Sequence, residues 1–423
     1  MEYKYLKWVD FKEISFWSVA YYRNKGNLFN QYFEKTILKD VLIPSRNIIE
    51  IKDEIQYKRI TVKVNANGVV LRDEVFGKEI GTKRQFLVKG GEFIVSKIDA
   101  RNGAFGIIPK ILENAIVTND FPLFNVSEKL ELSFLNLLCK TKMFVDFAKT
   151  CSSGTTNRQR IDISKFLNFQ IPLPSLAEQK AIVLAYQNKI NTAQELENEA
   201  KNLENQIEKY LFEELGIEQI QEKKEKIKGL QLVEFKDMER WDLWNEPNKV
   251  MKHYYPFFKL KDSILPIESK IEKVSKNEYK ENGVIPIISQ EKEFISGYTD
   301  LDVIPIYENQ PLILFGDHSQ TKKYVDFPFI CGADGVRILK PNKKFIPLFF
   351  FYYLETIKYE TSQKYTRHYK YLCEEKIPVP PLSKQNEIVA QITAMKQAQK
   401  DKTAQATRLR EEALKEFENL IFE

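Results

Sequence analysis

An internal repeat constrains this 423-residue chain more than any other feature. Residues 171–179 (IPLPSLAEQ) match residues 377–385 (IPVPPLSKQ) at an offset of 206, and residues 9–13 (VDFKE) match residues 233–237 (VEFKD) at an offset of 224. A tryptophan follows each upstream match at the same spacing. Because the two matches occur in the same order, we expect two tandem copies of one unit, the second shorter by 18 residues (224 minus 206) between these anchors.

Before each proline-rich motif the chain alternates short apolar runs with Gly and Asn. Runs such as residues 59–64, 91–96 and 310–315 are rich in β-branched and aromatic residues, which predicts short strands. Helices are expected over 132–149 and 347–357, where each globular part ends. The predicted fold class is therefore α+β, with two mixed α/β domains in a pseudo-two-fold tandem repeat.

After the first motif the sequence predicts one long helix. Pro172 and Pro174 cannot lie inside it, and Ser175 with Glu178 three residues later forms a capping-box signature. Gly216 is a suitable terminator. At 1.5 Å per residue, the roughly 40 residues from 176 to 215 span about 60 Å.

Apolar residues recur along both post-motif segments at steps of three and four. The second segment has a weaker seam, with a polar middle at Lys396, Gln399 and Lys402. Each helix could dock alone on its own domain, but the length of the stripe and its occurrence in each copy favour mutual packing as a coiled-coil-like antiparallel pair. The expected seam residues are Val183, Ile190, Leu196, Leu203, Ile207, Val389, Ile392, Leu409 and Phe417.

These patterns divide the chain into four parts. We expect a first globular domain over 1–170, a central helical region over 171–232, a second globular domain over 233–376, and a C-terminal helical region over 377–423.

The net charge of +5 becomes informative when it is divided along the repeat. Residues 176–226 contain 11 acidic and 7 basic side chains, a balance of −4, so the remainder of the chain carries +9. Positive charge on globular parts is compatible with a nucleic-acid partner but does not require one.

Two polar stretches in each copy are candidates for that contact. Residues 96–103 and 315–323 follow strand-like runs, and residues 152–160 and 358–371 form a second pair, the latter mixing basic side chains with four tyrosines. Such side chains bind phosphates and base edges, although most stretches of this kind are only solvated loops. The candidate DNA-binding residues are Lys97, Arg101, Asn102, Asn157, Arg158, Arg160, His318, Ser319, Gln320, Lys322, Lys323, Lys364, Arg367, His368 and Lys370.

The sequence lacks the usual signatures of catalysis. It has no Walker sequence and no Asn/Asp-Pro-Pro-Tyr/Phe motif, and its three histidines have no metal-ligand spacing. We therefore expect no catalytic residue, no metal and no cofactor in this chain. The four scattered cysteines, the lack of an apolar run of 18 residues and the absence of a leader-like N-terminus predict a cytoplasmic protein.

These residues resemble the specificity (S) subunit of type I restriction–modification systems over essentially the whole chain. The resemblance is carried by the duplicated Ile-Pro-hydrophobic-Pro-x-Leu-x-x-Gln motif before a long helix, by residues 96–109 (SKIDARNGAFGIIP), and by residues 331–339 (CGADGVRIL) after Gly316 and Asp317. It implies two target-recognition domains, each reading half of a bipartite DNA site, and two helical regions that act as a ruler and dock modification subunits.

The resemblance also implies partners and their cofactors. Two DNA adenine methyltransferase subunits would bind S-adenosylmethionine, and restriction subunits, whose presence stays open, would bring ATP and Mg. Because the two domains differ in sequence, the site should be asymmetric. The alternatives are a rod-like protein–protein adaptor without sequence-specific DNA binding and, less favoured, a self-contained enzyme.

Overall fold

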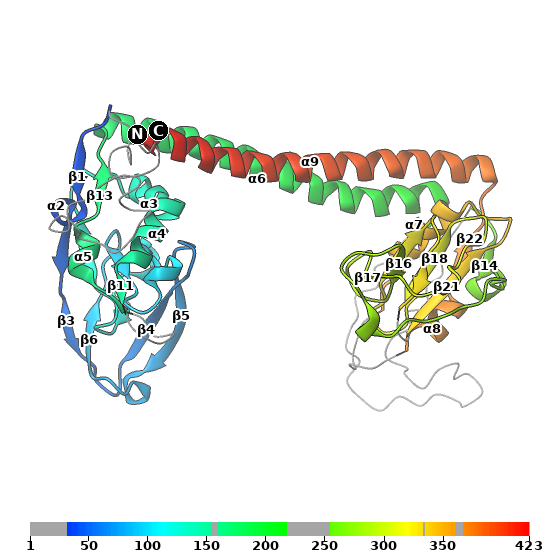
Figure 1. Ribbon diagram of the computed structural model, residues 1–423, viewed down its shortest axis with the longest axis horizontal. Helices are drawn as coiled ribbons and strands as arrows, with labels where there is room; N and C mark the ends of the chain where they lie inside the picture. The colour runs from blue at the N-terminus through cyan, green and yellow to red at the C-terminus, as the bar shows by residue number, and fades with distance from the viewer. Residues whose placement is uncertain (1–31, 154–159, 218–253, 333–334, 360–366, 423) are drawn as a thin grey trace, which may run out of the picture. The chain divides into compact units, whose positions relative to one another are not determined.

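The computed structural model describes residues 32–153, 160–217, 254–332, 335–359 and 367–422, so the upstream repeat anchors lie outside the described residues. The chain separates into two compact units, residues 1–196 with 404–423, and residues 197–403. Each unit therefore combines one globular domain, the first half of the long helix that follows it, and the second half of the other long helix (Figure 1). Among the described residues, no helix is long and apolar enough to cross a membrane.

The core of the first domain is a four-stranded antiparallel sheet in the order β2-β10-β7-β8. Phe93, Phe105 and Phe124 project from it and are fully buried against the adjacent helices. The elements are β2 (Leu42–Ser45), β7 (Phe93–Val95), β8 (Phe105–Ile107), β10 (Leu123–Val126), and the short helices α2 (Leu38–Val41) and α5 (Ile163–Leu167).

Two helices follow this sheet where the sequence predicts one helical stretch. Residues 132–149 form α3 (Leu132–Lys140) and α4 (Lys142–Thr150), so the predicted helical stretch is confirmed and is divided at Thr141. Thr141 is extended (φ −69°, ψ 144°), and its hydroxyl donates to the carbonyl of Leu138 at 2.6 Å while accepting from the amide of Phe144 at 3.3 Å. The threonine thus ends one helix and caps the next.

A second sheet extends the first domain, and two strand pairs complete it. The sheet has the order β3-β6-β9-β4-β5, in which only the β4–β9 pair is parallel. Its strands are β3 (Ile48–Glu50), β4 (Gln56–Val62), β5 (Val69–Phe76), β6 (Arg84–Leu87) and β9 (Ile116–Val117); the pairs are β1 (Lys35–Ile37) with β13 (Gln170–Pro172) and β11 (Ser152–Ser153) with β12 (Arg160–Ile161).

The second domain repeats this plan with fewer strands. The order β15-β21-β18-β19 matches β2-β10-β7-β8, and β17-β16-β20, with β16 parallel to β20, matches β5-β4-β9 without β3 and β6. Its elements are β14 (Phe257–Lys259), β15 (Ile264–Leu265), β16 (Ile285–Ile288), β17 (Gly297–Thr299), β18 (Leu312–Gly316), β19 (Lys322–Val325), β20 (Ile330–Cys331), β21 (Val336–Pro341), α7 (Pro347–Thr356), α8 (Tyr369–Glu374) and β22 (Lys376–Pro378). The predicted strands at 59–64, 91–96 and 310–315 and the helix at 347–357 are confirmed, as is the α+β tandem repeat.

The long helices are α6 (Leu176–Leu215) and α9 (Leu382–Phe422). At the start of α6 the backbone amide of Ser175 donates to the Glu178 carboxylate at 2.8 Å, and the amide of Glu178 donates to the Ser175 hydroxyl at 3.4 Å, which confirms the capping box. Gly216 ends the helix with φ +65°, as its sequence position predicts.

Within each unit the two long helices run antiparallel. In the first unit Lys189 bonds to Glu416, and Arg410 donates to the side chain of Gln194 at 3.2 Å. In the second unit Lys402 pairs with Glu199 at 2.6 Å and Lys384 pairs with Glu214 at 2.6 Å. Fully buried alanines, Ala193 and Ala406, allow the helices of the first unit to approach closely.

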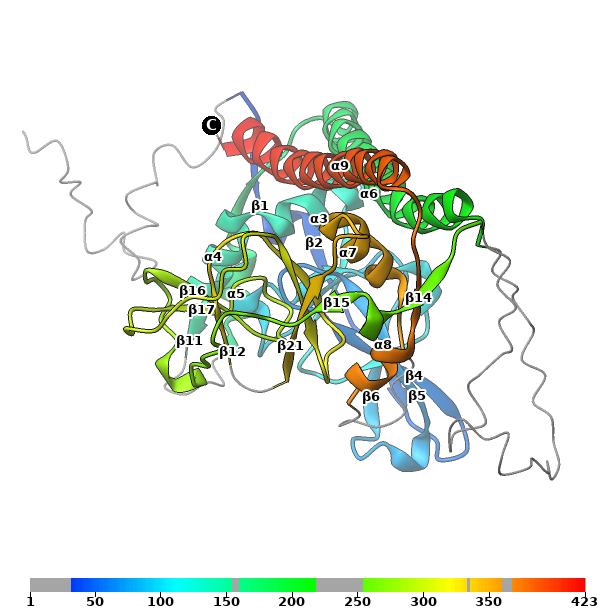
Figure 2. The same cartoon turned by 90° about the vertical axis from the view of Figure 1, so that its right-hand side faces the viewer.

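Five of the nine expected seam residues belong to or pack against the hydrophobic clusters that include the cores of the two domains: Val183, Ile207, Val389, Ile392 and Phe417. Ile392 and Phe417 are fully buried and the other seven are half-buried. Phe417 packs edge-to-face on Phe134 of α3, and Ile392 lies in the core of the second domain. Two residues in the polar middle of α9 have ionic partners, Lys402 as described above and Lys396, which pairs with Glu355 of α7 at 2.7 Å. Figure 2 shows α7 beside α9.

Candidate nucleic-acid interface

One loop occupies the same topological place in both domains. The β7–β8 loop (residues 96–104) and the β18–β19 loop (residues 317–321) each connect the two matching strands of the central sheet. Residues 103 and 320 stand two positions before the strands that follow, and both have left-handed backbones, with φ +78° at Gly103 and +57° at Gln320. The pairing predicted between the first stretches of the two copies therefore corresponds to a structural equivalence.

In the first domain the two candidate stretches lie together. The amide of Ile161 in β12 donates to the carbonyl of Lys97 at 2.8 Å, and the amide of Lys97 donates to the carbonyl of Asp120 at 2.8 Å. The side chain of Arg160 forms an ion pair with Asp120 at 2.7 Å. Backbone bonds therefore place Arg160 beside the β7–β8 loop.

A third element of this surface was not identified from the sequence. The tip of the β4–β5 hairpin docks on the loop, because the amide of Asn65 donates to the carbonyl of Asn102 at 2.7 Å and that of Ala66 donates to Gly103 at 2.8 Å. Asn65 and Ala66 are both left-handed, with φ +57° and +51°. The only local signal is the turn-like Asn-Ala-Asn-Gly sequence between two valine-rich runs, and it does not say where the turn docks.

The second domain joins its two stretches through side chains. The amide group of Gln320 donates to the carbonyl of Tyr359 at 2.9 Å and accepts from its backbone amide at 2.8 Å. Asp317 is buried; its carbonyl accepts from the amide of His368 at 2.9 Å, and its carboxylate accepts from the amide of Tyr369 at 2.9 Å. Exposed Arg337, which is not among the residues predicted from the sequence, lies over the Tyr369 ring with its guanidinium 5.1 Å from the ring centroid.

The turn between β16 and β17 docks on the β18–β19 loop as the β4–β5 tip docks on its counterpart. The ammonium group of Lys323 donates to the carbonyls of Ser289 and Glu293 at 2.8 and 2.5 Å. The hydroxyl of Thr321 donates to the carbonyl of Gln290 at 3.0 Å. Both domains therefore build the surface from the same three elements: a sheet loop, an inserted hairpin and the strand or segment before the last short helix.

The candidate residues differ in their access to solvent. Lys323 and His368 are buried, and Asn157, Arg158 and Lys364 lie outside the described residues. The exposed ones are Asn102, Arg160, Ser319, Arg367 and Lys370, and the half-buried ones are Lys97, Arg101, His318, Gln320 and Lys322.

Burial lowers the pKa of three of these groups. It lowers the pKa of Lys322 to about 8, and the ammonium group donates to the carbonyl of Ile357. Burial also lowers the pKa of Lys323 and that of His368, whose ring stacks on Tyr359 with centroids 5.5 Å apart. These three side chains contact protein groups, so they support the surface and do not form its outer face.

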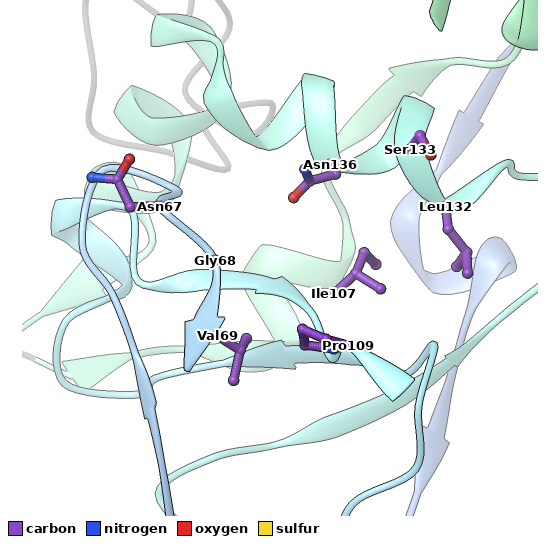
Figure 3. Close-up of a pocket in the computed structure, with 8 residues that line it drawn as sticks. All are labelled: Asn67, Gly68, Val69, Ile107, Pro109, Leu132, Ser133 and Asn136. Carbon is purple, nitrogen blue, oxygen red and sulfur yellow. The ribbon is translucent and has the colours of Figure 1, made fainter. Parts of the chain in front are cut away.

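A shallow pocket of about 300 Å³ lies between the hairpin and α3 in the first domain (Figure 3). None of its eight lining residues ionises, so the pocket offers no general acid, general base or metal ligand. In the described part of the chain no group of three His, Cys, Asp or Glu side chains could hold a metal ion. The lining residues are Asn67, Gly68, Val69, Ile107, Pro109, Leu132, Ser133 and Asn136.

The repeated strand order, with a long helix after each copy, defines a tandem-repeat protein of two α+β domains. The model of the type I restriction modification DNA specificity domain matches residues 30–209 and 255–408. The chain belongs to this family and contains its domain twice, so it is a DNA sequence-specificity subunit of the type I restriction–modification class. The predicted resemblance is confirmed.

One solved structure supports the fold, and a second is reported for its similarity in sequence and length. A chain from a structure described as "Structural basis underlying complex assembly and conformational transition of the type I R-M system" is 17% identical, with a TM-score of 0.56, covering 92% of this chain and 98% of that one. The HsdS subunit from Thermoanaerobacter tengcongensis is also 17% identical, with a TM-score of 0.47 and coverage of 92% and 97%. No curated protein sequence matches the chain.

Proposed function

We propose that each domain reads one half of a bipartite, asymmetric DNA site through its three-element surface, and that α6 and α9 set the spacing between the halves. The observation that carries this proposal is that one surface architecture occurs twice with different side chains. Equal architecture supports equal tasks, and different side chains support different half-site sequences.

Within this proposal the candidate residues take two roles. Exposed Asn102 and Arg160 contact DNA from the first domain, and Ser319, Arg367 and Lys370 contact it from the second. The buried or carbonyl-bound Lys322, Lys323 and His368 hold the second surface in shape. The domain boundaries at residues 170, 232 and 376 belong to the same proposal.

The partners are double-stranded DNA and two DNA adenine methyltransferase subunits docked on the helical regions. Those subunits hold S-adenosylmethionine, while this chain is non-catalytic and acts in the cytoplasm. A restriction subunit that uses ATP and Mg is a further partner where one is encoded. The solved neighbour with a TM-score of 0.56 is described in terms of complex assembly in a type I system, which supports a place for this chain in such a complex.

Co-expression with the adjacent methyltransferase gene, followed by methylome sequencing, tests the proposal. We expect one asymmetric motif with two half-sites and an unread spacer, and we expect Asn102→Ala to relax only one half-site. An assembled, active complex that methylates no specific motif would refute DNA reading and favour the protein–protein adaptor.

The spacing role has its own test. Removing seven residues from α6 and the seven opposite them from α9 shortens the helix pair by about 10 Å, or about three base pairs. The spacer should shorten while both half-sites stay the same. Altered half-sites would contradict the ruler role.

A further inference from the structure

Each long helix begins with a glutamine that water cannot reach. Gln179 lies in the first turn of α6 and Gln385 in the first turn of α9, and both are 0% exposed. They are the last residues of the duplicated motif at 171–179 and 377–385. A buried primary amide requires partners for its donors and acceptor, so the contacts of these side chains indicate their task.

The amide of Gln179 binds three backbone groups. Its Nε2 donates to the carbonyl of Pro174 at 2.7 Å and to the carbonyl of Lys129 at 3.0 Å. Its Oε1 accepts from the backbone amide of Glu131 at 2.8 Å. Pro174 precedes α6, whereas Lys129 and Glu131 belong to the segment that enters α3, so one side chain joins the long helix to the globular domain.

Gln385 repeats these contacts. Its Nε2 donates to the carbonyls of Pro380 at 2.9 Å and Lys344 at 2.8 Å, and its Oε1 accepts from the amide of Ile346 at 2.7 Å. In the globular domain the first bound residue is lysine in both copies (Lys129 and Lys344), whereas the second differs (Glu131 and Ile346). The same two backbone positions are used before α3 and before α7, and the third bond goes to a proline two residues before each long helix. Because the contacts are made to the backbone, the side chains of the bound residues can change while the geometry between the long helix and its domain is kept.

We infer that Gln179 and Gln385 are positioning residues that fix the direction in which each long helix leaves its domain, and thereby restrict the spacer that the protein accepts. This inference rests on the proposed function. The bond to the proline before the helix holds the side chain in place, and the two directional bonds to the globular domain define an orientation, which apolar packing alone defines less sharply. Over a helix about 60 Å long, a tilt of about 5° moves the far end by about 5 Å, more than the rise of about 3.4 Å per base pair.

The first test measures orientation without DNA. Spin labels on non-canonical amino acids at positions 113, in the globular domain, and 195, on α6, report the distance between them in the full-length chain. Gln179→Met should broaden the distance distribution, and Gln187→Met, which alters an exposed glutamine of the same helix, should not. Gln179→Asn, which keeps the amide but is one methylene shorter, serves if the methionine variant does not fold. An unchanged distribution in a folded variant would overturn the inference.

The second test measures spacer choice in the complex with the methyltransferase. A DNA library keeps both half-sites and varies the spacer by one or two base pairs. In Gln179→Met and Gln385→Met we expect unchanged half-sites and a loss of spacer discrimination of about tenfold, equivalent to about 1.4 kcal/mol. Discrimination equal to that of the wild type would overturn the inference while leaving DNA reading intact. A wild-type complex without any bipartite motif would instead refute the proposed function, and the distance measurement would still decide the role of the glutamines.

Discussion

The equivalent left-handed position of the two candidate loops is occupied by Gly103 in the first copy and by Gln320 in the second. Glycine adopts this conformation without a steric penalty, whereas glutamine does not. Gln320 uses its side chain to bind both backbone groups of Tyr359, and the first copy instead relies on backbone bonds from Asn65 and Ala66. One loop position thus supports two different ways of holding the surface.

The central sheet and the contacts that join each domain to its long helix differ much less between the two copies than the loops do. The order and direction of the central strands and the three bonds of Gln179 and Gln385 are the same in both copies. The comparison shows that the loops of the candidate surface can change while the central sheet and the domain–helix contacts stay the same. A sequence-reading protein needs this property, because new half-sites must be acquired without loss of assembly.

The largest expected difference between the copies is in the loss of unfolding free energy when the cation of an ion pair is removed, because the pair in the second domain is buried. In the second domain Lys340 pairs with Glu308 at 2.6 Å, and the Glu308 side chain is 2% exposed. Although burial favours its neutral form, the bonds from Lys340 and Ser269 hold the pKa of Glu308 at about 2. Lys340→Met leaves a buried carboxylate without its cation and should cost about 3–5 kcal/mol of unfolding free energy in urea titrations.

Arg59 of the first domain provides the matched comparison. It pairs with Asp73 at 2.7 Å, but the two side chains are 32% and 37% exposed. Arg59→Met should therefore cost no more than about 1 kcal/mol. Equal losses for the two variants would show that burial does not distinguish these pairs.

The next prediction concerns the left-handed glycine. A Cβ on Gly103 would lie 3.1 Å from the Cα and the nitrogen of Asn65, in a backbone with φ +78°. Gly103→Ala should lower the unfolding free energy by about 1–2 kcal/mol. Gly81→Ala is the control, because a Cβ there meets nothing within 4 Å, and its effect should stay within about 1 kcal/mol. Similar destabilisation by both variants would contradict the role assigned to residue 103.

Local sequence signals predicted the parts that are built locally. The two prolines, the capping box of Ser175 and Glu178, and Gly216 place α6 over residues 176–215, because each acts within one turn of the chain. The repeat in turn predicted two domains of one plan. The helix signals act between residues close in the sequence, and the repeat is visible when two segments of the sequence are compared directly.

The candidate surfaces were predicted less completely because tertiary contacts decide them. Lys323 looks like a phosphate ligand in the sequence, yet its acceptors lie about 30 residues away, at Ser289 and Glu293. The docking of the β4–β5 tip on Asn102 is likewise a contact between distant segments. Thr141 divides a predicted helix because its hydroxyl caps α4, a local effect that the apolar pattern of residues 132–149 conceals.

Two substitutions of Gln320 separate the contribution of its side-chain bonds from the strain of its left-handed backbone. Gln320→Ala loses both bonds to Tyr359 and keeps the left-handed backbone, whereas Gln320→Gly loses the same bonds but removes the strain. The glycine variant should therefore be more stable than the alanine variant by about 1 kcal/mol, the reverse of the order expected at an ordinary position. Thermal unfolding of the two variants gives the comparison, and an alanine variant at least as stable as the glycine variant would contradict it.

The smallest expected effect is a difference between the two copies in how local stability at the last short helix depends on pH. Asp162 caps α5 in the first domain by accepting from the amides of Ser164 and Lys165, whereas the position before α8 is occupied by buried His368. Burial lowers the pKa of His368; nearby Asp317 opposes this shift and His318 reinforces it. The folded state therefore resists a proton that the unfolded state accepts, so this stability is complete above about pH 6.5 and declines as the pH falls below that value. As the pH falls from 7.5 to 5.5, the amide protection factors of residues 367–374, which are corrected for the pH dependence of intrinsic exchange, should decrease in the wild type. They should decrease less in His368→Phe, which keeps a ring on Tyr359 but cannot titrate, and an equal decrease would assign the pH response to other groups.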